Sequence, residues 1–392
     1  MEGQSYEAAI KDFPDKMTSS VETPCFIVSE GALRRNLEIL ASVKRRTGAK
    51  VLLALKAFAM FSTFPLIRKY LDGVCASGTI EAQLGFEEFG KEVHTFAPAY
   101  SEADMKRVIR YSDTIIFNSI AQWKRHRGAI ERSGKRIEVG LRINPGYSEV
   151  ENRLYNPSAP GSRLGMAASD LDGDDLDGID GLHFHSLCEQ NSDVLVRVLR
   201  SFEKRCGKYI PRMKWINFGG GHHITRKGYD TGLLVRTVND FRRRYGVQVN
   251  IEPGEAVVLN AGVLVATVLD IVHNRVDTAI LDTSAEAHMP DVLAGPYRPE
   301  VIGAGRPGMR KHTYRLGGLT CLAGDVIGDY SFSKPLKTGD RIVFLDMAHY
   351  SMVKTTTFNG IRHPSLALYN PGTGKVRVVK KFGYDAYKER LS

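Results

Sequence analysis

Short apolar runs alternate with longer amphipathic runs between about residues 50 and 252, and this alternation limits the fold more than any other feature of the chain. Eight of the apolar runs have the length of strands: 51–55, 73–76, 93–97, 114–117, 137–143, 180–185, 214–218 and 248–251. The runs between them have helical patterns, which are clearest at Thr79–Phe89, Glu102–Tyr111, Ala121–Ser133, Asp193–Lys208 and Thr231–Tyr245. Strands that alternate with helices indicate a parallel sheet. Eight such units within about 200 residues are typical of a closed (β/α)8 barrel of the TIM type rather than an open sheet.

The sequence changes in character after Glu252-Pro253-Gly254, where helix signals become scarce. β-branched segments separated by turn residues follow, and the clearest are Val257–Leu259, Val263–Ile271, Thr278–Asp282 and Arg341–Leu345. This pattern predicts a mostly antiparallel β domain. We expect a strand at Cys25–Val28, ahead of a helix at about 31–46, to join that domain.

The predicted organisation is therefore a barrel followed by a β domain. The boundaries are 30–253 for the barrel, and 254–392 together with 24–29 for the β domain. The segment Asn152–Asp180 interrupts the barrel pattern with Asn-Pro, Pro-Gly and Asp-Gly steps, which predict a long loop.

The composition excludes several classes of protein. The net charge is +10, but the basic residues form small scattered groups such as Lys44-Arg45-Arg46 and Arg242-Arg243-Arg244. The sequence contains no basic stripe with interleaved aromatic residues, which is the pattern that indicates nucleic-acid binding. No apolar run reaches the roughly 18 residues that a membrane helix needs, and the polar N-terminus lacks the apolar core of a signal peptide. Five cysteines without paired spacing are typical of a reducing compartment, so we expect a cytoplasmic protein that binds neither nucleic acid nor membrane.

Chemically useful side chains lie at the ends of five strands, where barrels of this type build their sites. These residues are Lys56, Arg142, the pair His183 and His185, the run Gly219-Gly220-Gly221, and Glu252. Lys56 closes a buried apolar run, and burying an ammonium costs several kcal/mol unless something compensates. A desolvated lysine has a lowered pKa and can attack an aldehyde to form a Schiff base. The alternative is a lysine that simply leaves the strand into solvent.

The other strand ends supply what an aldehyde cofactor with a ring and a phosphate requires. Three consecutive glycines let backbone N–H groups approach an anion closely. These glycines follow the seventh strand, where barrels commonly hold phosphate. Glu252 is able to pair with a protonated ring nitrogen, and Arg142 is able to keep that carboxylate ionised by charge pairing. His185 is suited to stacking on the ring. His183, His185 and Cys188 are also ligand types of metal sites, but no further carboxylate and histidine at strand ends completes a set, so we expect no metal.

Together these residues resemble the fold-type III pyridoxal phosphate decarboxylases, the alanine racemase-like group that includes ornithine and diaminopimelate decarboxylases. The motifs that carry the resemblance are Lys56, Phe184-His185, Gly219-Gly220-Gly221, Glu252-Pro253-Gly254, Gly317-Gly318-Leu319-Thr320-Cys321, and Tyr350 with Phe358-Asn359-Gly360. The resemblance implies that Lys56 forms the Schiff base with pyridoxal 5'-phosphate, that His185 stacks on its ring and that Glu252 binds the pyridine nitrogen. The phosphate ligands that it implies are Gly219, Gly220, Gly221 and Tyr350. It also implies a homodimer with shared active sites, in which Cys321 reaches the neighbouring subunit and protonates Cα after CO2 leaves.

One departure from that group narrows the substrate. Ornithine- and diaminopimelate-type enzymes carry arginine after Glu-Pro-Gly, where this chain has Glu255. A glutamate reverses the charge and suits an amine rather than a distal carboxylate. With His222-His223 and His288-Met289-Pro290-Asp291, the chain resembles the branch that decarboxylates carboxynorspermidine and carboxyspermidine, polyamines with one terminal carboxyl group. The acidic residues that we expect near the substrate's ammonium groups are Glu255, Asp282, Glu286, Asp291 and Asp325, with Glu255 and Asp291 favoured.

The residues leave other functions open. The first is a decarboxylase of the same fold that acts on diaminopimelate or arginine. The second is a catalytically silent regulator that binds a protein partner, although a non-enzyme has no use for Lys56, Glu252 and Cys321 together. The third is a metal-dependent barrel hydrolase, since such enzymes also use a His-x-His pair. The preference between carboxynorspermidine and carboxyspermidine is open as well, because one methylene is worth only about 1–3 kcal/mol in a pocket.

Overall fold

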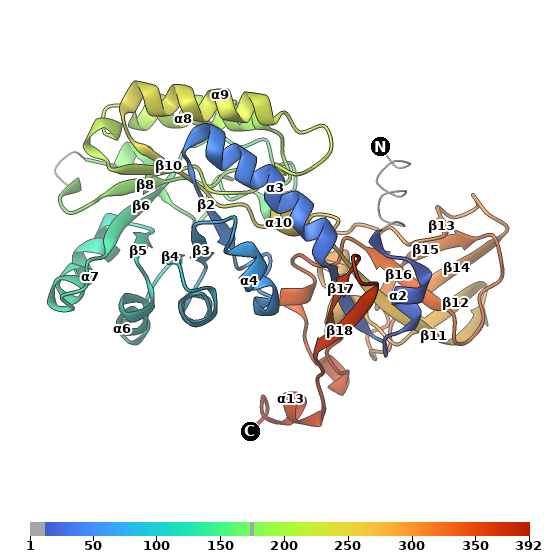
Figure 1. The fold of residues 1–392 in the computed structure, drawn as a ribbon. Coiled ribbons are helices and arrows are strands. Elements are labelled where there is room, and N and C mark those ends of the chain that lie inside the picture. The colour runs from blue at the N-terminus through green and yellow to red at the C-terminus, as the bar shows by residue number, and fades with distance from the viewer. Residues whose placement is uncertain (1–11, 173–175) are drawn as a thin grey trace. The chain divides into compact units, whose positions relative to one another are not determined.

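The computed structural model describes residues 12–172 and 176–392 (Figure 1). Residues 1–11, which form much of the polar N-terminus, and residues 173–175 of the predicted loop lie outside the described residues. The chain divides into two compact units, one formed by Asn36–Val257 and the other by Met1–Arg35 with Val258–Ser392. The first unit is a barrel and the second is a β domain.

The barrel contains eight strands that close into a ring. In order around the ring, they are β2 (Lys50–Ala54), β3 (Gly73–Ala76), β4 (Glu92–Phe96), β5 (Thr114–Phe117), β6 (Glu138–Asn144), β8 (Gly181–His183), β9 (Trp215–Asn217) and β10 (Gln248–Ile251). Every pairing is parallel, and the pairing of β10 with β2 closes the ring. The predicted (β/α)8 barrel is therefore confirmed.

Helices connect the strands along the outside of the barrel (Figure 1). They are α3 (Glu30–Thr47), which leads into β2, then α4 (Phe64–Ile67), α5 (Thr79–Leu84) with a π-helix at Gly85–Phe89, α6 (Glu102–Tyr111), α7 (Ile120–Arg132), α8 (Ser192–Cys206), α9 (Thr231–Tyr245) and α10 (Glu255–Val258). The Ser101 hydroxyl caps α6 by accepting the N–H of Asp104. The basic groups noted in the sequence lie in the last turns of α3 and α9, where the helix dipole favours cations.

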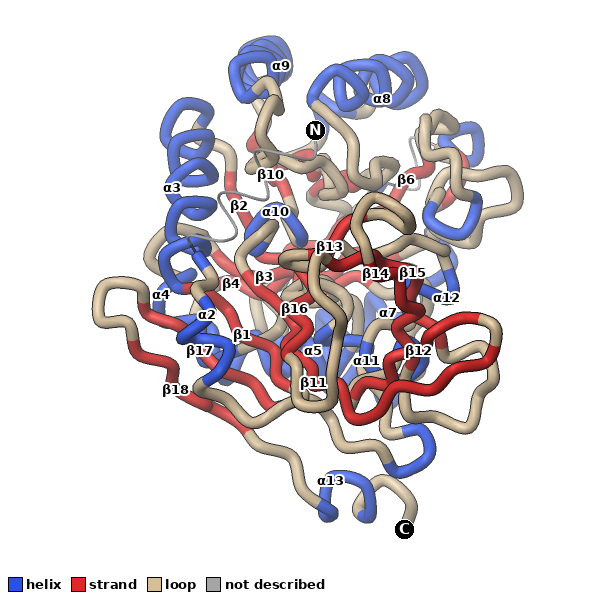
Figure 2. Tube along the Cα trace, turned by 90° about the vertical axis from the view of Figure 1, so that its right-hand side faces the viewer, coloured by secondary structure: helices blue, strands red, loops and turns tan. Residues whose placement is uncertain are grey.

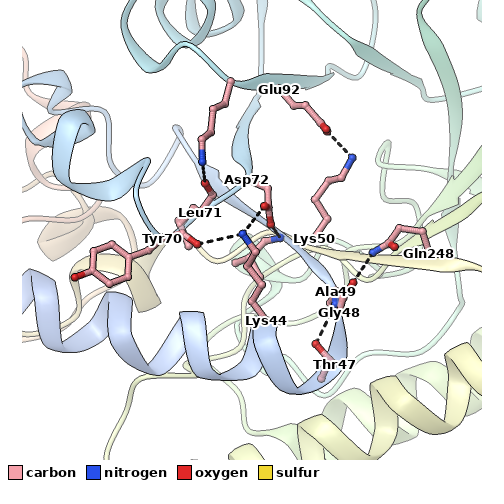
Figure 3. Close-up of polar contacts among 12 residues, drawn as sticks. Lys44, Thr47, Gly48, Ala49, Lys50, Tyr70, Leu71, Asp72, Glu92 and Gln248 are labelled. Carbon is pink, nitrogen blue, oxygen red and sulfur yellow. Dashed lines mark hydrogen bonds and ion pairs between the residues drawn. The ribbon is translucent and has the colours of Figure 1, made fainter.

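A repeated aspartate contact holds the N-terminal ends of the strands together. Each aspartate directly precedes one strand, and its carboxylate accepts the N–H of the second residue of a neighbouring strand. The pairs are Asp72 with Val51, Asp113 with Val93 and Asp180 with Val139, at 3.0, 2.9 and 2.8 Å. Lys44 reaches Asp72 from α3 and also donates to the Tyr70 carbonyl (Figure 3). These contacts fix the register of the strands at the end of the barrel opposite the predicted site.

Trp215 fills the barrel interior near the same end. A Cβ added at Gly140 would lie 2.4 Å from its indole ring, and one added at Gly181 would lie 2.2 Å from it. Glycine at these two strand positions therefore makes room for the largest side chain of the interior. The barrel is a packed core at this end, and the functional side chains lie further along the same strands.

The β domain is built on one large mixed sheet (Figure 2). Its strands are β1 (Cys25–Ser29), β11 (Gly262–Asn274), β12 (Val276–Leu281), β13 (Ala304–Gly305), β14 (His312–Gly317), β15 (Val326–Phe332), β16 (Arg341–Leu345), β17 (Ser365–Asn370) and β18 (Lys375–Lys380). The strand order is β13-β15-β14-β12-β11-β1-β17-β18, with β16 also paired to β11. Among the described strands of the β domain, only β1 with β17 and β12 with β14 pair in parallel. The prediction of a mostly antiparallel domain that includes the strand near residue 25 is therefore confirmed.

Short helices and apolar residues complete this domain. The helices are α2 (Asp15–Ser19), α11 (Ala285–His288), α12 (Asp291–Ala294) and α13 (Tyr384–Lys388). Met17 of α2 packs with Cys25, Ile27, Val263 and Val265 in one buried cluster. Within the described residues, no helix of either unit has the length and apolar content needed to cross a bilayer.

Two local predictions were incomplete or wrong. The predicted strand Val257–Leu259 is mostly helix, because α10 covers residues up to Val258; three apolar residues are too few to distinguish the two structures. The predicted loop Asn152–Asp180 contains β7 (Met166–Ala167), which pairs in parallel with β6, and short 3-10 turns.

Candidate active site

A row of polar side chains crosses the barrel at the carboxyl ends of three adjacent strands. The strand register pairs Arg142 with His183 and His183 with Asn217. All three residues are buried. Glu252 directly follows β10, the strand beside β9, so its carboxylate meets this row from the fourth strand.

The Glu252 carboxylate is held chiefly by Asn217. The Asn217 side-chain amide donates to Glu252 Oε1 at 2.6 Å, and His183 Nε2 lies 3.7 Å from Glu252 Oε2. The Cys75 thiol on β3 also interacts with Glu252. Burial raises the pKa of Cys75 well above its usual value, and the negative charge of the nearby Glu252 raises it further. Glu252 therefore accepts from a neutral amide and lies beside a neutral thiol.

Arg142 interacts with Glu252 through its charge and not through a hydrogen bond. Its guanidinium lies over the Phe96 ring, 4.6 Å from the centroid, and donates to the His185 carbonyl at 3.3 Å. Burial lowers the pKa of Arg142 to about 10, and the charge of Glu252 opposes that shift. The structure thus contains the electrostatic interaction on which the predicted charge pairing depends, while Asn217 forms the direct contact with Glu252.

His185 and the glycine loop are joined by a hydrogen bond. The Gly220 N–H donates to His185 Nδ1 at 3.0 Å, so Nδ1 is unprotonated and the ring hydrogen is on Nε2. Burial lowers the pKa of His185 well below its usual value, and the nearby charge of Lys56 lowers it further. His185 is therefore a neutral, oriented ring, which is the form that a stacking residue needs.

Three consecutive glycines are required here because three backbone segments meet. An added Cβ would lie 2.5 Å from the Phe184 carbonyl at Gly219, 2.1 Å from the Glu252 carbonyl at Gly220 and 1.9 Å from the Leu187 carbonyl at Gly221. The values of φ at Gly219 and Gly221 are +68° and +84°, which favour glycine. The Gly219 N–H donates to Asn217 Oδ1 and the Gly220 N–H to His185 Nδ1, so both of these N–H groups already have partners within the protein.

Lys56 lies in the turn directly after β2, next to these groups. Its charge contributes to the lowered pKa values of His183 and His185, after the larger effect of burial. Among the described residues, none accepts a hydrogen bond from Lys56 Nζ or forms an ion pair with it. Lys56 thus lies within electrostatic range of two buried histidines, the Cys75 thiol and the Glu81 carboxylate, without a hydrogen bond to any of them. An amine in such a position is a candidate to react with an aldehyde.

The chain matches known proteins over nearly its whole length. Residues 25–348 match the family model described as pyridoxal-dependent decarboxylase, C-terminal sheet domain. The carboxynorspermidine/carboxyspermidine decarboxylase of Campylobacter jejuni is 46% identical over 94% of this chain and 98% of its own length. This chain belongs to the pyridoxal-dependent decarboxylases.

Two further comparisons place the chain within the pyridoxal-dependent decarboxylases. The carboxyaminopropylagmatine decarboxylase of a Synechocystis species is 44% identical over 98% of this chain and 99% of its own length. The crystal structure of the Campylobacter jejuni carboxynorspermidine decarboxylase complexed with norspermidine has a TM-score of 0.88 and 45% identity, and it covers 94% of this chain and 100% of that chain. Diaminopimelate decarboxylase of Helicobacter pylori, with a TM-score of 0.82 and 14% identity, shares the fold.

The residues of the barrel fit the pyridoxal phosphate of this family. Lys56 offers an amine for the aldehyde, Glu252 an acid for the ring nitrogen, and His185 a flat neutral ring. Both ring nitrogens of His183 are buried without a hydrogen-bond partner among the described residues, as expected where a polar ligand completes the site. No group of three or more His, Cys, Asp or Glu side chains in the described ranges is arranged to hold a metal ion.

The sequence missed two residues of this decarboxylase's barrel site. Asn217 was not singled out, although it lies two residues after Trp215 on β9 and so points to the same side of the strand. His223 was given no role of its own, but it is buried and its Nε2 lies 2.9 Å from Glu255 Oε2. Strand alternation signals Asn217, whereas no local pattern signals the contact of His223 with Glu255.

Two acidic residues predicted near the substrate serve the β domain instead. Asp282 accepts from the Thr23 hydroxyl at 2.6 Å and from the Thr267 N–H at 2.7 Å. Asp325 accepts five hydrogen bonds, from Ser284, Ala285, Glu286 and twice from Thr320. Since both oxygens of each carboxylate are already engaged by the protein, we no longer consider Asp282 and Asp325 candidate substrate ligands.

Of the remaining predicted residues of the β domain, Cys321 and Tyr350 lie outside helices and strands, and Asp291 begins α12. Cys321 is exposed, and its N–H donates to Asn359 Oδ1 at 2.7 Å. Asp291 forms an ion pair with Lys354. Tyr350 has a φ of +45°, and a non-glycine residue in this region of backbone space often marks a functional site.

Proposed function

We propose that this pyridoxal-dependent decarboxylase acts on carboxynorspermidine or carboxyspermidine and releases CO2 to form norspermidine or spermidine. The single observation that carries the proposal is whole-length similarity, at 45% identity, to a decarboxylase solved with norspermidine. An acid at position 255, where ornithine- and diaminopimelate-type enzymes carry arginine, supports a cationic substrate.

The surroundings of Glu255 support its role as a ligand for a substrate amine. It begins α10, directly after Glu252-Pro253-Gly254, and its side chain is only 11% exposed. Burial raises the pKa of Cys188 to about 12, and the charges of Glu189 and Glu255 add to that shift while Lys56 opposes it. Glu255 and Lys56 thus act on the same thiol, which supports placing the substrate's distal amine on Glu255 and its amino-acid end near Lys56. Asp291 is the second proposed ligand; its Oδ1 forms an ion pair with Lys354, so a substrate ammonium group would share this carboxylate with Lys354.

The proposed roles divide between cofactor and chain. Bound pyridoxal phosphate supplies an electron sink for the electron pair left on Cα when CO2 departs. Lys56 would hold its aldehyde carbon, Glu252 would keep its ring nitrogen protonated, and His185 would pack on its ring. The glycine run 219–221 and Tyr350 would bind its phosphate. Cys321 would return a proton from its thiol to Cα.

We also propose a cytoplasmic homodimer in which Cys321 serves the neighbouring subunit's site. All five cysteines of the chain lie in the described part and are free, which supports a reducing compartment. Exposed apolar residues at Leu319, Leu322 and Phe358 accompany the exposed Cys321, as expected of a surface that another subunit covers. Mixing inactive Lys56→Ala and Cys321→Ala proteins tests the shared site, because mixed dimers should regain activity. Mixtures that stay inactive, although mass spectrometry shows mixed dimers, would refute sharing.

Turnover of purified protein with pyridoxal phosphate tests the substrate. We expect CO2 release from carboxynorspermidine and carboxyspermidine to exceed that from diaminopimelate by at least about 100-fold in kcat/KM, since the mismatched buried charge of its distal carboxylate costs about 3 kcal/mol or more. Comparable turnover of diaminopimelate would refute the proposal.

Carboxyaminopropylagmatine is the second candidate substrate. The carboxyaminopropylagmatine decarboxylase of Synechocystis matches 98% of the chain at 44% identity. The guanidinium group of carboxyaminopropylagmatine is also a cation, which an acid at position 255 suits. The same turnover assay separates the two, because the preferred substrate will have the higher kcat/KM.

A further inference from the structure

Asn217 connects the acid of the cofactor site to the glycine loop. Its Nδ2 donates to Glu252 Oε1 at 2.6 Å, and its Oδ1 accepts the Gly219 N–H at 2.8 Å. Its side chain is fully buried. We propose that Asn217 is a positioning residue that aims the Glu252 carboxylate at the ring nitrogen of pyridoxal phosphate and couples that acid to the glycine loop 219–221.

The orientation of the Asn217 amide follows from its partners. The Gly219 backbone N–H can only donate, so the atom that faces it must be the carbonyl oxygen of Asn217. The NH2 group must then face Glu252. A donor at this distance stabilises a carboxylate and disfavours its protonated form.

The other groups around Glu252 do not replace this contact. The titratable and charged side chains that interact with it come from three strands and are Cys75, Arg142 and His183. Lys56 lies near Cys75 and His183. Arg142 acts only through its charge, and Cys75 is a weak thiol donor. His183 lies 3.7 Å away and is neutral, because burial and the charge of Arg142 lower its pKa well below the usual value. Asn217 thus makes the shortest polar contact of the Glu252 side chain among the described residues.

Replacing Asn217 with aspartate tests this role, because a carboxyl group keeps the shape and donates only while it is protonated. Two carboxyl groups this close share one proton, and the second ionisation of the pair is raised by about two pH units or more. Asn217→Asp should therefore bind pyridoxal phosphate nearly as well as the wild type at pH 5.5, and lose about tenfold or more in affinity as the pH rises to 8.5. Asn217→Ala, which never donates, should lose affinity at every pH.

Two controls separate positioning from general damage. Asn36→Asp places a carboxylate at a buried asparagine on α3, outside the ring of strands, and should leave the pH dependence of cofactor affinity unchanged. Asn217→Asp combined with Glu252→Gln leaves one carboxylate, so the pH-dependent loss in melting temperature of the cofactor-free protein should be smaller than in Asn217→Asp alone.

The proposal would be overturned if Asn217→Asp and Asn217→Ala lost the same cofactor affinity at every pH. It would also be overturned if the melting temperature of the variant with both Asn217→Asp and Glu252→Gln fell with pH as much as that of Asn217→Asp alone. The role of Asn217 rests on the cofactor site proposed above and not on the substrate. Since the measurements are cofactor affinity and melting temperature, failure of the polyamine assay leaves them interpretable.

Discussion

Substitution of Asp325 should destabilise the β domain far more than substitution of Asp329, an exposed aspartate on the strand that follows Asp325. Asp325 directly precedes β15, is 4% exposed and accepts five hydrogen bonds between 2.7 and 3.3 Å. Asp325→Asn keeps the shape but replaces one oxygen with a donor. At Oδ1 the new NH2 would face the N–H groups of Ala285 and Glu286, and at Oδ2 it would face the N–H of Thr320.

Either placement leaves at least one buried backbone N–H unpaired. The unpaired group costs about 1–3 kcal/mol, and the hydrogen bonds that lose their charged acceptor weaken by about 1 kcal/mol each. We therefore expect a loss of about 3–5 kcal/mol, a large part of the roughly 5–15 kcal/mol that stabilises a typical domain.

Chemical unfolding in urea, compared with Asp329→Asn, measures this effect. Asp329 lies on β15 and pairs with Arg315, but both side chains are 41% exposed, so its substitution should cost no more than about 1 kcal/mol. Asp325 also fixes Thr320, next to Cys321, and Asp325→Asn should therefore speed modification of the Cys321 thiol by a thiol reagent. A difference of less than 1 kcal/mol between the two variants would refute this account of the aspartate network.

Three further outcomes follow from the structure. The Lys56→Ala protein should elute from gel filtration without the absorbance of bound pyridoxal phosphate. The Lys50→Ala protein, changed at the other end of β2, should retain the cofactor and its absorbance. Gly220→Ala should reduce cofactor affinity at least about tenfold, because its Cβ would lie 2.1 Å from a backbone carbonyl and the loop must shift; a titration showing wild-type affinity would contradict this. Burial lowers the pKa of His288 to about 4 from its ordinary 6.5, so the unfolded chain binds a proton that the folded chain does not between these values. Stability is therefore full above pH 6.5 and falls toward pH 4 by up to roughly 3 kcal/mol from this residue, and His288→Gln should flatten the fall in urea unfolding measured across that range.

The regular elements of the barrel were predictable from the sequence because their signals are local. The helices Glu102–Tyr111 and Thr231–Tyr245 were predicted with their observed bounds, since an amphipathic period and a capping side chain lie within each segment. The strand at Thr114–Phe117 was likewise predicted as observed. The strand predicted at Val257–Leu259 failed because three apolar residues carry no period.

The positions of Lys56, Arg142, His185 and Glu252 around one barrel end also followed from the sequence, because parallel strands of a closed barrel all end at the same face. Which groups touch one another did not follow. Asn217, rather than Arg142, donates to Glu252, and Asp282 is engaged by Thr23, a residue 259 positions away.

The sequence by itself thus determined the barrel, the family and the chemical groups at the strand ends, since each depends on patterns within a strand or helix. Tertiary structure alone decided which carboxylates are engaged by the protein and which contact holds the acid at the end of β10. The physical reason is that a hydrogen bond depends on distances of a few tenths of an ångström between side chains on different segments, and no pattern along one segment encodes those distances.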